Sequence, residues 1–264
     1  MKKTTRVLCL LTVAGLVYSL QAGDSKWSLK FDVGLALPGD IKVEEMEGVK
    51  LPLPFTLSAP GGVRTLTVMG ENVPLADFAD FADSLGLGDV DINTLALGDY
   101  SIGKPKLTLD PGIRFDLGVG YNLTKAFSVE IESGLIYNSG DEMQVNVVTP
   151  GGPVSFKEAL DDFSLYQVPV LANFLYTFPL ESKFKPFVGV GAGGVFVMVD
   201  TGDDSESDFV FAYQAMAGCS YAIRENFDVG ISYKFLGTSS PEFGGVKTSD
   251  IFTHSILAQL NYRF

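Results

Sequence analysis

The sequence predicts an all-β protein, a transmembrane antiparallel up-and-down β-barrel of eight strands. Three observations lead to this prediction. Apolar and polar residues alternate over long segments, short and long connections alternate between those segments, and the N-terminus has the features of an export signal. The 29 glycines, 20 phenylalanines and 10 tyrosines also favour strands and turns over helices.

Residues 1–22 form the predicted signal peptide. Lys2, Lys3 and Arg6 precede an apolar run that ends in small residues, and we expect cleavage after Ala22. The run is shorter than the roughly 20 residues that a spanning helix requires, which argues against a transmembrane anchor. We therefore expect residues 23–264 to be the exported barrel, in which the single cysteine, Cys219, leaves no internal disulfide.

The charge balance excludes one class of partner. The formal net charge is −13, with 19 Lys and Arg residues against 32 Asp and Glu residues. Such an acidic chain is not expected to bind nucleic acid or to act as a polybasic membrane-surface module.

Eight segments have the length and alternation of membrane-spanning strands, for which about 9–11 residues suffice. In the first of them, Trp27, Leu29 and Phe31 share one face, and Lys30 and Asp32 lie on the other. The fifth is ambiguous because its glycines say little about direction. The expected strands lie at about 26–37, 111–123, 126–138, 164–178, 184–199, 208–223, 226–236 and 251–264.

The charged residues of these segments share the face opposite the apolar one. In a barrel that face lines the lumen, which eight strands make just wide enough for side chains to fill. Opposite charges should pair there, because an unpaired buried charge costs several kcal/mol. The resulting network is either a structural plug or the gate of a small pore. It comprises Lys30, Asp32, Arg114, Asp116, Glu130, Glu132, Asp228, Lys234 and Arg263.

The connections support the same architecture. Those after the second, fourth and sixth strands are short, and the others are long, above all the first at about 39–107. Outer-membrane barrels have short periplasmic turns and longer extracellular loops. Aromatic residues mark the short-turn ends and predict an interfacial girdle of Trp27, Tyr121, Phe127, Tyr176, Phe178, Tyr221 and Phe227.

Together, the signal peptide, the amphipathic strands, the segment KPFVGVGAGG and the closing LNYRF resemble the small outer-membrane β-barrel family of opacity-type, OmpX-like, OmpW-like and OmpA-transmembrane-domain proteins. The resemblance covers about 23–38 and 108–264. It implies a monomer in the outer membrane, in contact with lipid and lipopolysaccharide. It also implies that Phe264, with Leu260 and Tyr262 behind it, is an assembly signal for the barrel-insertion machinery; the alternative is a girdle residue. The chain departs from the family in its long first loop, and we expect no C-terminal peptidoglycan-binding domain.

Within the first loop, NVPLADFADFADSLGLG predicts a short helix from Pro74 to Gly86, with Leu75, Phe78, Phe81 and Leu85 on one face. The segments RTLTVMGE and DINTLALGDYS are expected to form a hairpin above the membrane, or two further strands that raise the barrel to ten. Whatever specificity the protein has, including for an extracellular partner, is expected in this loop.

The segment DTGDDSESD gathers carboxylates that are weak candidates for a metal site. They could bind Ca²⁺ or bridge divalent ions to lipopolysaccharide, but the spacing fits no EF-hand, so a solvated, self-repelling loop is the favoured interpretation. We expect no cofactor. The candidates are Asp200, Asp203, Asp204, Glu206 and Asp208.

No catalytic site is expected. The sole histidine, His254, is followed by Ser255, and adjacent strand residues face opposite sides, so the two cannot form a nucleophile–base pair. The leading hypothesis is a structural barrel that presents acidic loops for surface interactions. The alternative is a narrow channel or transporter for small or hydrophobic solutes, and the third is a lipid-modifying enzyme.

Overall fold

The computed structural model describes residues 26–264 apart from 47–48, 60–64, 69–70, 74–94 and 203. The predicted signal peptide and the predicted helix from Pro74 to Gly86 lie outside the described residues. Within the described part of the chain, no helix is long and apolar enough to cross a membrane.

Eight strands close a barrel in which each pairs antiparallel with its neighbours and the last pairs with the first. This confirms the predicted fold class, and most boundaries agree within two residues. The barrel strands are β1 (Trp27–Pro38), β9 (Gly112–Asn122), β10 (Phe127–Thr149), β12 (Ser164–Thr177), β13 (Phe184–Asp200), β14 (Ser205–Arg224), β15 (Phe227–Thr238) and β18 (Phe252–Arg263).

Strand β10 is 23 residues long and does not end near residue 138 as the sequence predicted. Its first part pairs with β9 and β12 in the barrel wall. Its second part continues beyond the rim and pairs with β8 and β11. The extension formed because these later partners satisfy its backbone hydrogen bonds, which local sequence does not reveal.

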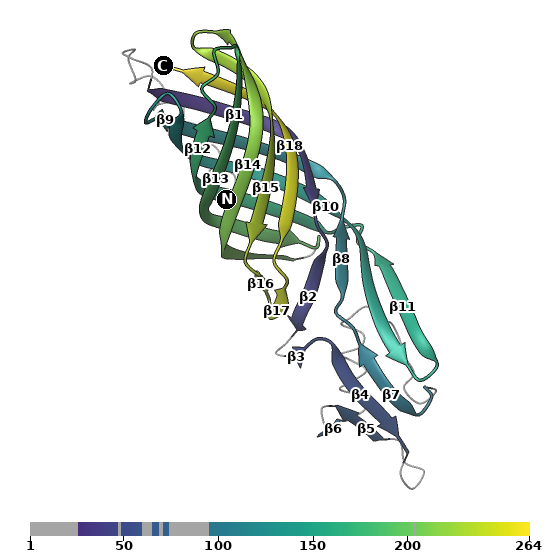
Figure 1. Cartoon of the computed structure of the whole chain (residues 1–264). Coiled ribbons are helices and arrows are strands. Elements are labelled where there is room, and N and C mark those ends of the chain that lie inside the picture. Colours follow the sequence, from purple (N-terminus) through teal and green to yellow (C-terminus); the bar gives the residue numbers. More distant parts are fainter. Residues whose placement is uncertain (1–25, 47–48, 60–64, 69–70, 74–94, 203) are drawn as a thin grey trace, which may run out of the picture.

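The long first loop builds a sheet beyond the rim, around the extension of β10 (Figure 1). Eight strands nonetheless close the ring, so the ten-strand alternative is wrong. The strands beyond the rim are β2 (Ile41–Met46), β3 (Val49–Lys50), β4 (Leu53–Ser58), β5 (Thr65–Val68), β6 (Glu71–Val73), β7 (Gly98–Ile102), β8 (Lys106–Leu109), β11 (Gly152–Ala159), β16 (Glu242–Phe243) and β17 (Val246–Thr248).

The expected hairpin between RTLTVMGE and DINTLALGDYS is also wrong. Strand β5, from the first segment, pairs with β4 and β6, whereas β7, from the second, pairs with the other edge of β4 and with β10. The missing element was β4, whose alternate residues Leu53, Phe55 and Leu57 are buried. Two prolines, Pro52 and Pro54, weaken its strand signal in the sequence.

The sheet beyond the rim has its own apolar core. Its members come from β2, β4, β5, β7 and the β10 extension, together with the turn before β4. They are Val43, Leu51, Leu53, Phe55, Leu57, Leu66, Tyr100, Ile102, Val145 and Val147. The region is therefore a packed structure in its own right and not only a connection between two barrel strands.

Candidate functional site: the barrel interior

The outer wall of the barrel is apolar and exposed, and its interior holds the charges. On β10, Ile131 is 60% exposed, while the neighbouring residues Glu130 and Glu132 are buried inside. This distribution is the reverse of that in a water-soluble protein and is typical of a barrel wall that faces lipid.

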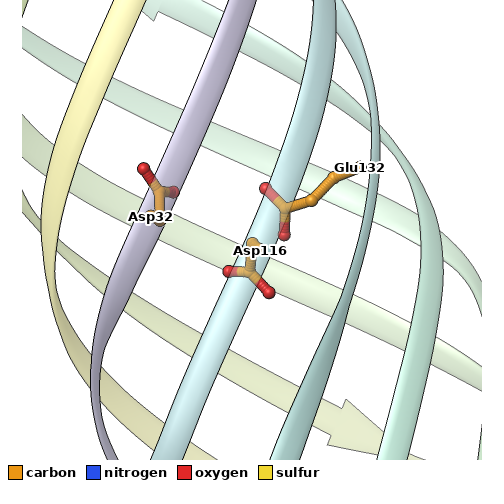
Figure 2. A group of neighbouring side chains, drawn as sticks. All are labelled: Asp32, Asp116 and Glu132. Carbon is orange, nitrogen blue, oxygen red and sulfur yellow. The ribbon is translucent and has the colours of Figure 1, made fainter. Parts of the chain in front are cut away.

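At the centre of the lumen, three carboxylates surround one ammonium group. Nζ of Lys234, on β15, lies 2.8 Å from Asp32 Oδ2, 2.8 Å from Asp116 Oδ2 and 2.7 Å from Glu132 Oε2. Figure 2 shows the three acidic side chains as neighbours on the adjacent strands β1, β9 and β10. Lys234 is fully buried, so these pairs act without the screening that weakens surface salt bridges.

The same three carboxylates have the proximity of a metal site. Their oxygens lie within 4.8 Å of one another. However, the position that a cation would take between them is held by the Lys234 ammonium. We therefore assign the cluster to ion pairing within the barrel.

Arg114 supplies the second cation of the cluster. Its Nε donates to both oxygens of Asp116, at 3.0 and 2.8 Å, and its Nη2 donates to Glu132 Oε1 at 3.2 Å and to Gln214 Oε1 at 2.6 Å. This charge-assisted set ties β9 to β10 and to β14 across the lumen.

Two amides that sequence reasoning missed link this cluster to its neighbour. Gln214 Nε2 donates to Glu132 Oε1 and to Asn173 Oδ1, and Asn173 Nδ2 donates to Glu130 and Glu132. Glu130 in turn accepts from Lys30 Nζ at 3.2 Å. Each amide lies an even number of residues from the other lumen-facing positions of its strand, and this alternation could have identified both of them.

Glycines on the lumen face make room for these side chains. A Cβ at Gly134 would lie 2.3 Å from Asp116 Oδ1 and 2.2 Å from the Phe115 carbonyl oxygen, and one at Gly191 would lie 1.9 Å from Asn173 Oδ1. Gly191 is one of the glycines that left the direction of the fifth strand ambiguous, and the network requires it because a side chain there would collide with Asn173.

Toward the long loops, the lumen becomes apolar, which the sequence analysis did not anticipate. The packed residues come from six barrel strands and from segments that cover the mouth. They are Ala36, Ile41, Leu109, Ile136, Leu165, Leu171, Val195, Val197, Val210, Ala212, Leu236 and Ile251, all buried. The lumen is thus filled by a charged layer and then by a mainly apolar layer, which also holds the buried pair Gln167 and Thr253.

At the short-turn end, one buried carboxylate serves two cations. Asp228 pairs with Lys185 Nζ at 3.2 Å and with the guanidinium of Arg263, whose Nη2 also donates to the Glu225 carbonyl oxygen. Of the nine residues predicted for the lumen network, seven belong to the central network, and these include Lys30 and Glu130. The other two, Asp228 and Arg263, form this separate group. Lys185 belongs to the strand of ambiguous direction and was missed.

The predicted girdle residues lie at the short-turn end and contact one another. Ring centroids of Trp27 and Tyr121 are 4.9 Å apart, and those of Phe127 and Tyr176, and of Tyr176 and Phe178, are each 5.0 Å apart. Tyr221 is exposed beside Phe184, and Phe227 is half-buried. Leu260 and Tyr262 are exposed on the same wall, and the Tyr262 ring stacks on Phe264.

A second set of aromatic side chains, which sequence reasoning did not single out, lies toward the long-loop end. Phe196 packs on Phe209, and Phe235 packs on Tyr213 and Phe252. The apolar wall therefore carries aromatic side chains near both of its edges, as membrane interfaces favour.

The acidic segment forms part of the β13–β14 hairpin, in which Asp200 pairs with Ser205. Asp203 lies outside the described residues. Among the described members, Asp200 caps the Gly202 N–H and Asp208 accepts from the Glu242 N–H, and no three members approach closely enough to hold an ion.

His254 and Ser255 lie on opposite faces of β18. Ser255 is buried in the lumen, and His254 is exposed on the wall, where its Nδ1 lies 2.6 Å from the Tyr233 hydroxyl.

Comparisons with known proteins agree with this architecture. Residues 72–264 match the family model of the outer membrane protein beta-barrel domain. Among solved structures, the chain is similar to Neisserial surface protein A, with 14% identity and a TM-score of 0.48, covering 92% of this chain and 100% of that one. It is also similar to the outer membrane protease OmpT from Escherichia coli, with 9% identity and a TM-score of 0.46, covering 93% of this chain and 99% of that one. A third similar structure is OprG from Pseudomonas aeruginosa, with 13% identity and a TM-score of 0.40, covering 92% of this chain and 98% of that one. No curated protein matches. These TM-scores are low, so the assignment rests on the family model.

Proposed function

Since the chain belongs to the family of the outer membrane protein β-barrel domain, as its resemblance implied, we propose that it is a closed barrel that anchors an acidic, surface-exposed sheet for interaction with an extracellular partner. The family gives an outer-membrane location and a membrane-embedded barrel. In such barrels the short turns face the periplasm and the long loops face outward. The sheet around β10 is then extracellular.

The filled lumen is the observation that carries this proposal. The ion-paired layer around Lys234 and the apolar layer around Ile136 lie one after the other across the barrel. An ion that entered would have to leave its hydration shell and displace paired charges, and would then meet a closely packed, mainly apolar layer. A structural plug is therefore a better account of the network than a gate, and it leaves the outer surface as the place of function.

The extracellular region has a surface suited to a cationic partner. Ten of its side chains form a buried apolar core, and its acidic residues outnumber its lysines. The hairpin with Asp204 and Glu206 exposes carboxylates that no lysine or arginine of the described residues pairs with. Long-range attraction of a positively charged partner would accelerate its association.

Two measurements test the proposal. In a planar bilayer, the barrel is expected to pass no steady current, and Arg114→Ala is expected to stay silent because the apolar layer remains. In liposomes, a fluorescent oligolysine peptide is expected to bind, whereas oligoglutamate does not. Binding should weaken in Asp204→Asn/Glu206→Gln and persist in the matched control Glu181→Gln/Glu225→Gln, which alters only the short-turn end. A steady wild-type current, or equal peptide binding by both variants, would overturn the proposal.

A second candidate, binding of small hydrophobic solutes, is favoured by one cavity. A cavity of about 270 Å³ at the extracellular mouth is lined mainly by apolar side chains, including Val43, Leu107, Phe163 and Leu165. The filled lumen below it means that such a solute would need a lateral route into the membrane. Binding of a fluorescent apolar probe that Leu165→Trp abolishes would support this function, and unchanged binding would count against it.

Export and assembly complete the proposal. Residues 1–22 would direct export, and residues 23–264 would form the barrel with the insertion at about 39–107. Phe264, Tyr262 and Leu260 would be recognised by the barrel-insertion machinery, and the outer aromatic side chains would contact lipid and lipopolysaccharide. Replacing Phe264 with Ser should lower the amount of folded barrel in the membrane, whereas Phe252→Ser, an exposed control at the start of β18, should not.

We propose no enzymatic activity. The Tyr233 hydroxyl beside His254 is not joined by an acidic side chain within the described residues, so a nucleophile, base and orienting acid are not assembled there.

A further inference from the structure

The short-turn end of the lumen contains a cavity of about 680 Å³ that the proposed function does not use. Its lining runs from Thr124 and Lys125, in the turn between β9 and β10, to the ion pair of Lys30 and Glu130, which belongs to the ion-paired layer. The cavity is therefore a blind pocket that is entered from the periplasmic side. Its volume lies in the range of pockets for small organic ligands, about 300–1,000 Å³.

This blind pocket, which we call the vestibule, is basic, although the chain as a whole is strongly acidic. Five cations line it, Lys26, Lys30, Lys125, Lys185 and Arg263, whereas the acidic residues lining it are Glu130 and Asp228. Lys30 is matched by Glu130, but Lys185 and Arg263 share the single carboxylate of Asp228. Lys26 and Lys125 form no ion pair with the described residues.

The surplus cations are positioned for a ligand. The side chains of Lys185 and Arg263 are 30% and 19% exposed, so their donors reach the cavity while their other contacts hold them in place. Asn261 Oδ1, also on the lining, is buried and has no hydrogen-bond partner among the described residues, and Leu175 and Phe187 supply apolar walls. Cations in a pocket with low-dielectric walls attract anions more strongly than cations on an open surface.

We propose that this periplasmic vestibule binds a small soluble organic anion with at least two negative charges, such as a polycarboxylate or a sugar phosphate. Lys185 and Arg263 bind one anionic group beside Asp228. Lys26 and Lys125, at the mouth, attract the second. The Asn261 amide and the apolar walls contact the body of the ligand. The vestibule has no outlet through the barrel, so the pocket captures or senses the anion and does not conduct it.

The test is calorimetric titration of the refolded, detergent-solubilised chain with citrate, glucose 6-phosphate and, as a neutral reference, glucose. We expect one saturable site for at least one anion and none for glucose. Affinity should fall at least tenfold between about 10 mM and about 150 mM salt, as the Debye length shortens from about 30 Å to about 8 Å. The better of the two anions distinguishes carboxylate from phosphate recognition.

The variant Lys26→Gln/Lys125→Gln/Lys185→Gln tests the location, and it leaves Arg263 to pair with Asp228 so that no buried charge is abandoned. We expect at least tenfold weaker binding. The control Lys42→Gln/Lys157→Gln/Lys247→Gln makes the same change in net charge at the opposite end and should bind as the wild type does. Migration of the unheated protein in gels reports folding of both. Absence of saturable binding to either anion, or equal weakening in the two triple variants, would overturn the proposal.

Discussion

The barrel and the sheet beyond its rim distribute the same kinds of side chain in opposite ways. In the barrel, Ile131 faces outward and Glu132 is buried; in the sheet, Val145 and Val147 are buried and Asn146 is exposed. All of these residues lie on one strand, β10. The comparison teaches that alternation along a strand identifies two faces but not their surroundings, which are set by whatever covers each face.

The largest effect is expected from removing the cation at the centre of the lumen. Lys234→Met leaves Asp32, Asp116 and Glu132 buried together without their shared ammonium, and we expect a loss of about 3–5 kcal/mol in the free energy of unfolding. Urea unfolding in detergent or lipid measures it. Lys157→Met removes an exposed cation that pairs with Glu142 on the β10–β11 hairpin, and should cost less than about 1 kcal/mol. Similar losses in both variants would contradict the contrast between regions.

The second prediction compares two exposed apolar residues of β10. Ile131→Arg places a charge against lipid and should cost about 2–4 kcal/mol if it lies near the membrane midplane. Val148→Arg, at a position that is 52% exposed beyond the rim, should change stability by no more than about 0.5 kcal/mol. Unfolding of both variants in lipid bilayers measures the difference, and equal costs would mean that the two positions face the same medium.

A smaller effect is expected at a glycine that the network requires. Gly134→Ala forces a Cβ against the Phe115 carbonyl oxygen and the Asp116 carboxylate, and overpacking of this kind costs about 1–3 kcal/mol. Gly151, in the turn between β10 and β11, has only Thr149 Oγ1 nearby, at 3.6 Å from an added Cβ. Gly151→Ala should therefore be close to neutral in the same unfolding assay. A neutral Gly134→Ala would show that the lumen is looser than the contacts indicate.

The smallest stability effect is expected in the acidic hairpin. Asp204→Asn/Glu206→Gln removes two exposed charges, so the free energy of unfolding should change by no more than about 0.5 kcal/mol, although binding of the oligolysine peptide weakens. Thermal unfolding measures the stability of the variant, and titration with the peptide measures its binding in the same sample. A stability loss comparable with that of Lys234→Met would mean that these carboxylates are structural.

Much of the barrel could be predicted because its signals are local. The eight spanning strands follow from alternation over segments of sufficient length, and the residues of the central cluster follow from the polar face of each strand. Asn173, Gln214 and Lys185 were harder, because β12 and β14 have apolar residues on both faces and β13 is rich in glycine. The sheet beyond the rim was largely missed, since its strands pair across long sequence separations, as β4 does with β7.

The sequence by itself determined the period of two, the approximate positions of the eight spanning segments and the register that keeps Arg114 and Lys234 off the lipid face. A shift of one residue would turn those charges outward, so these features are specified strand by strand. Only the tertiary structure decided that Lys234 lies among three carboxylates from three strands, that an apolar layer closes the lumen above them, and that β10 passes from lipid into a protein core. Each of these depends on which strands become neighbours, and strand pairing is a property of the whole closed ring.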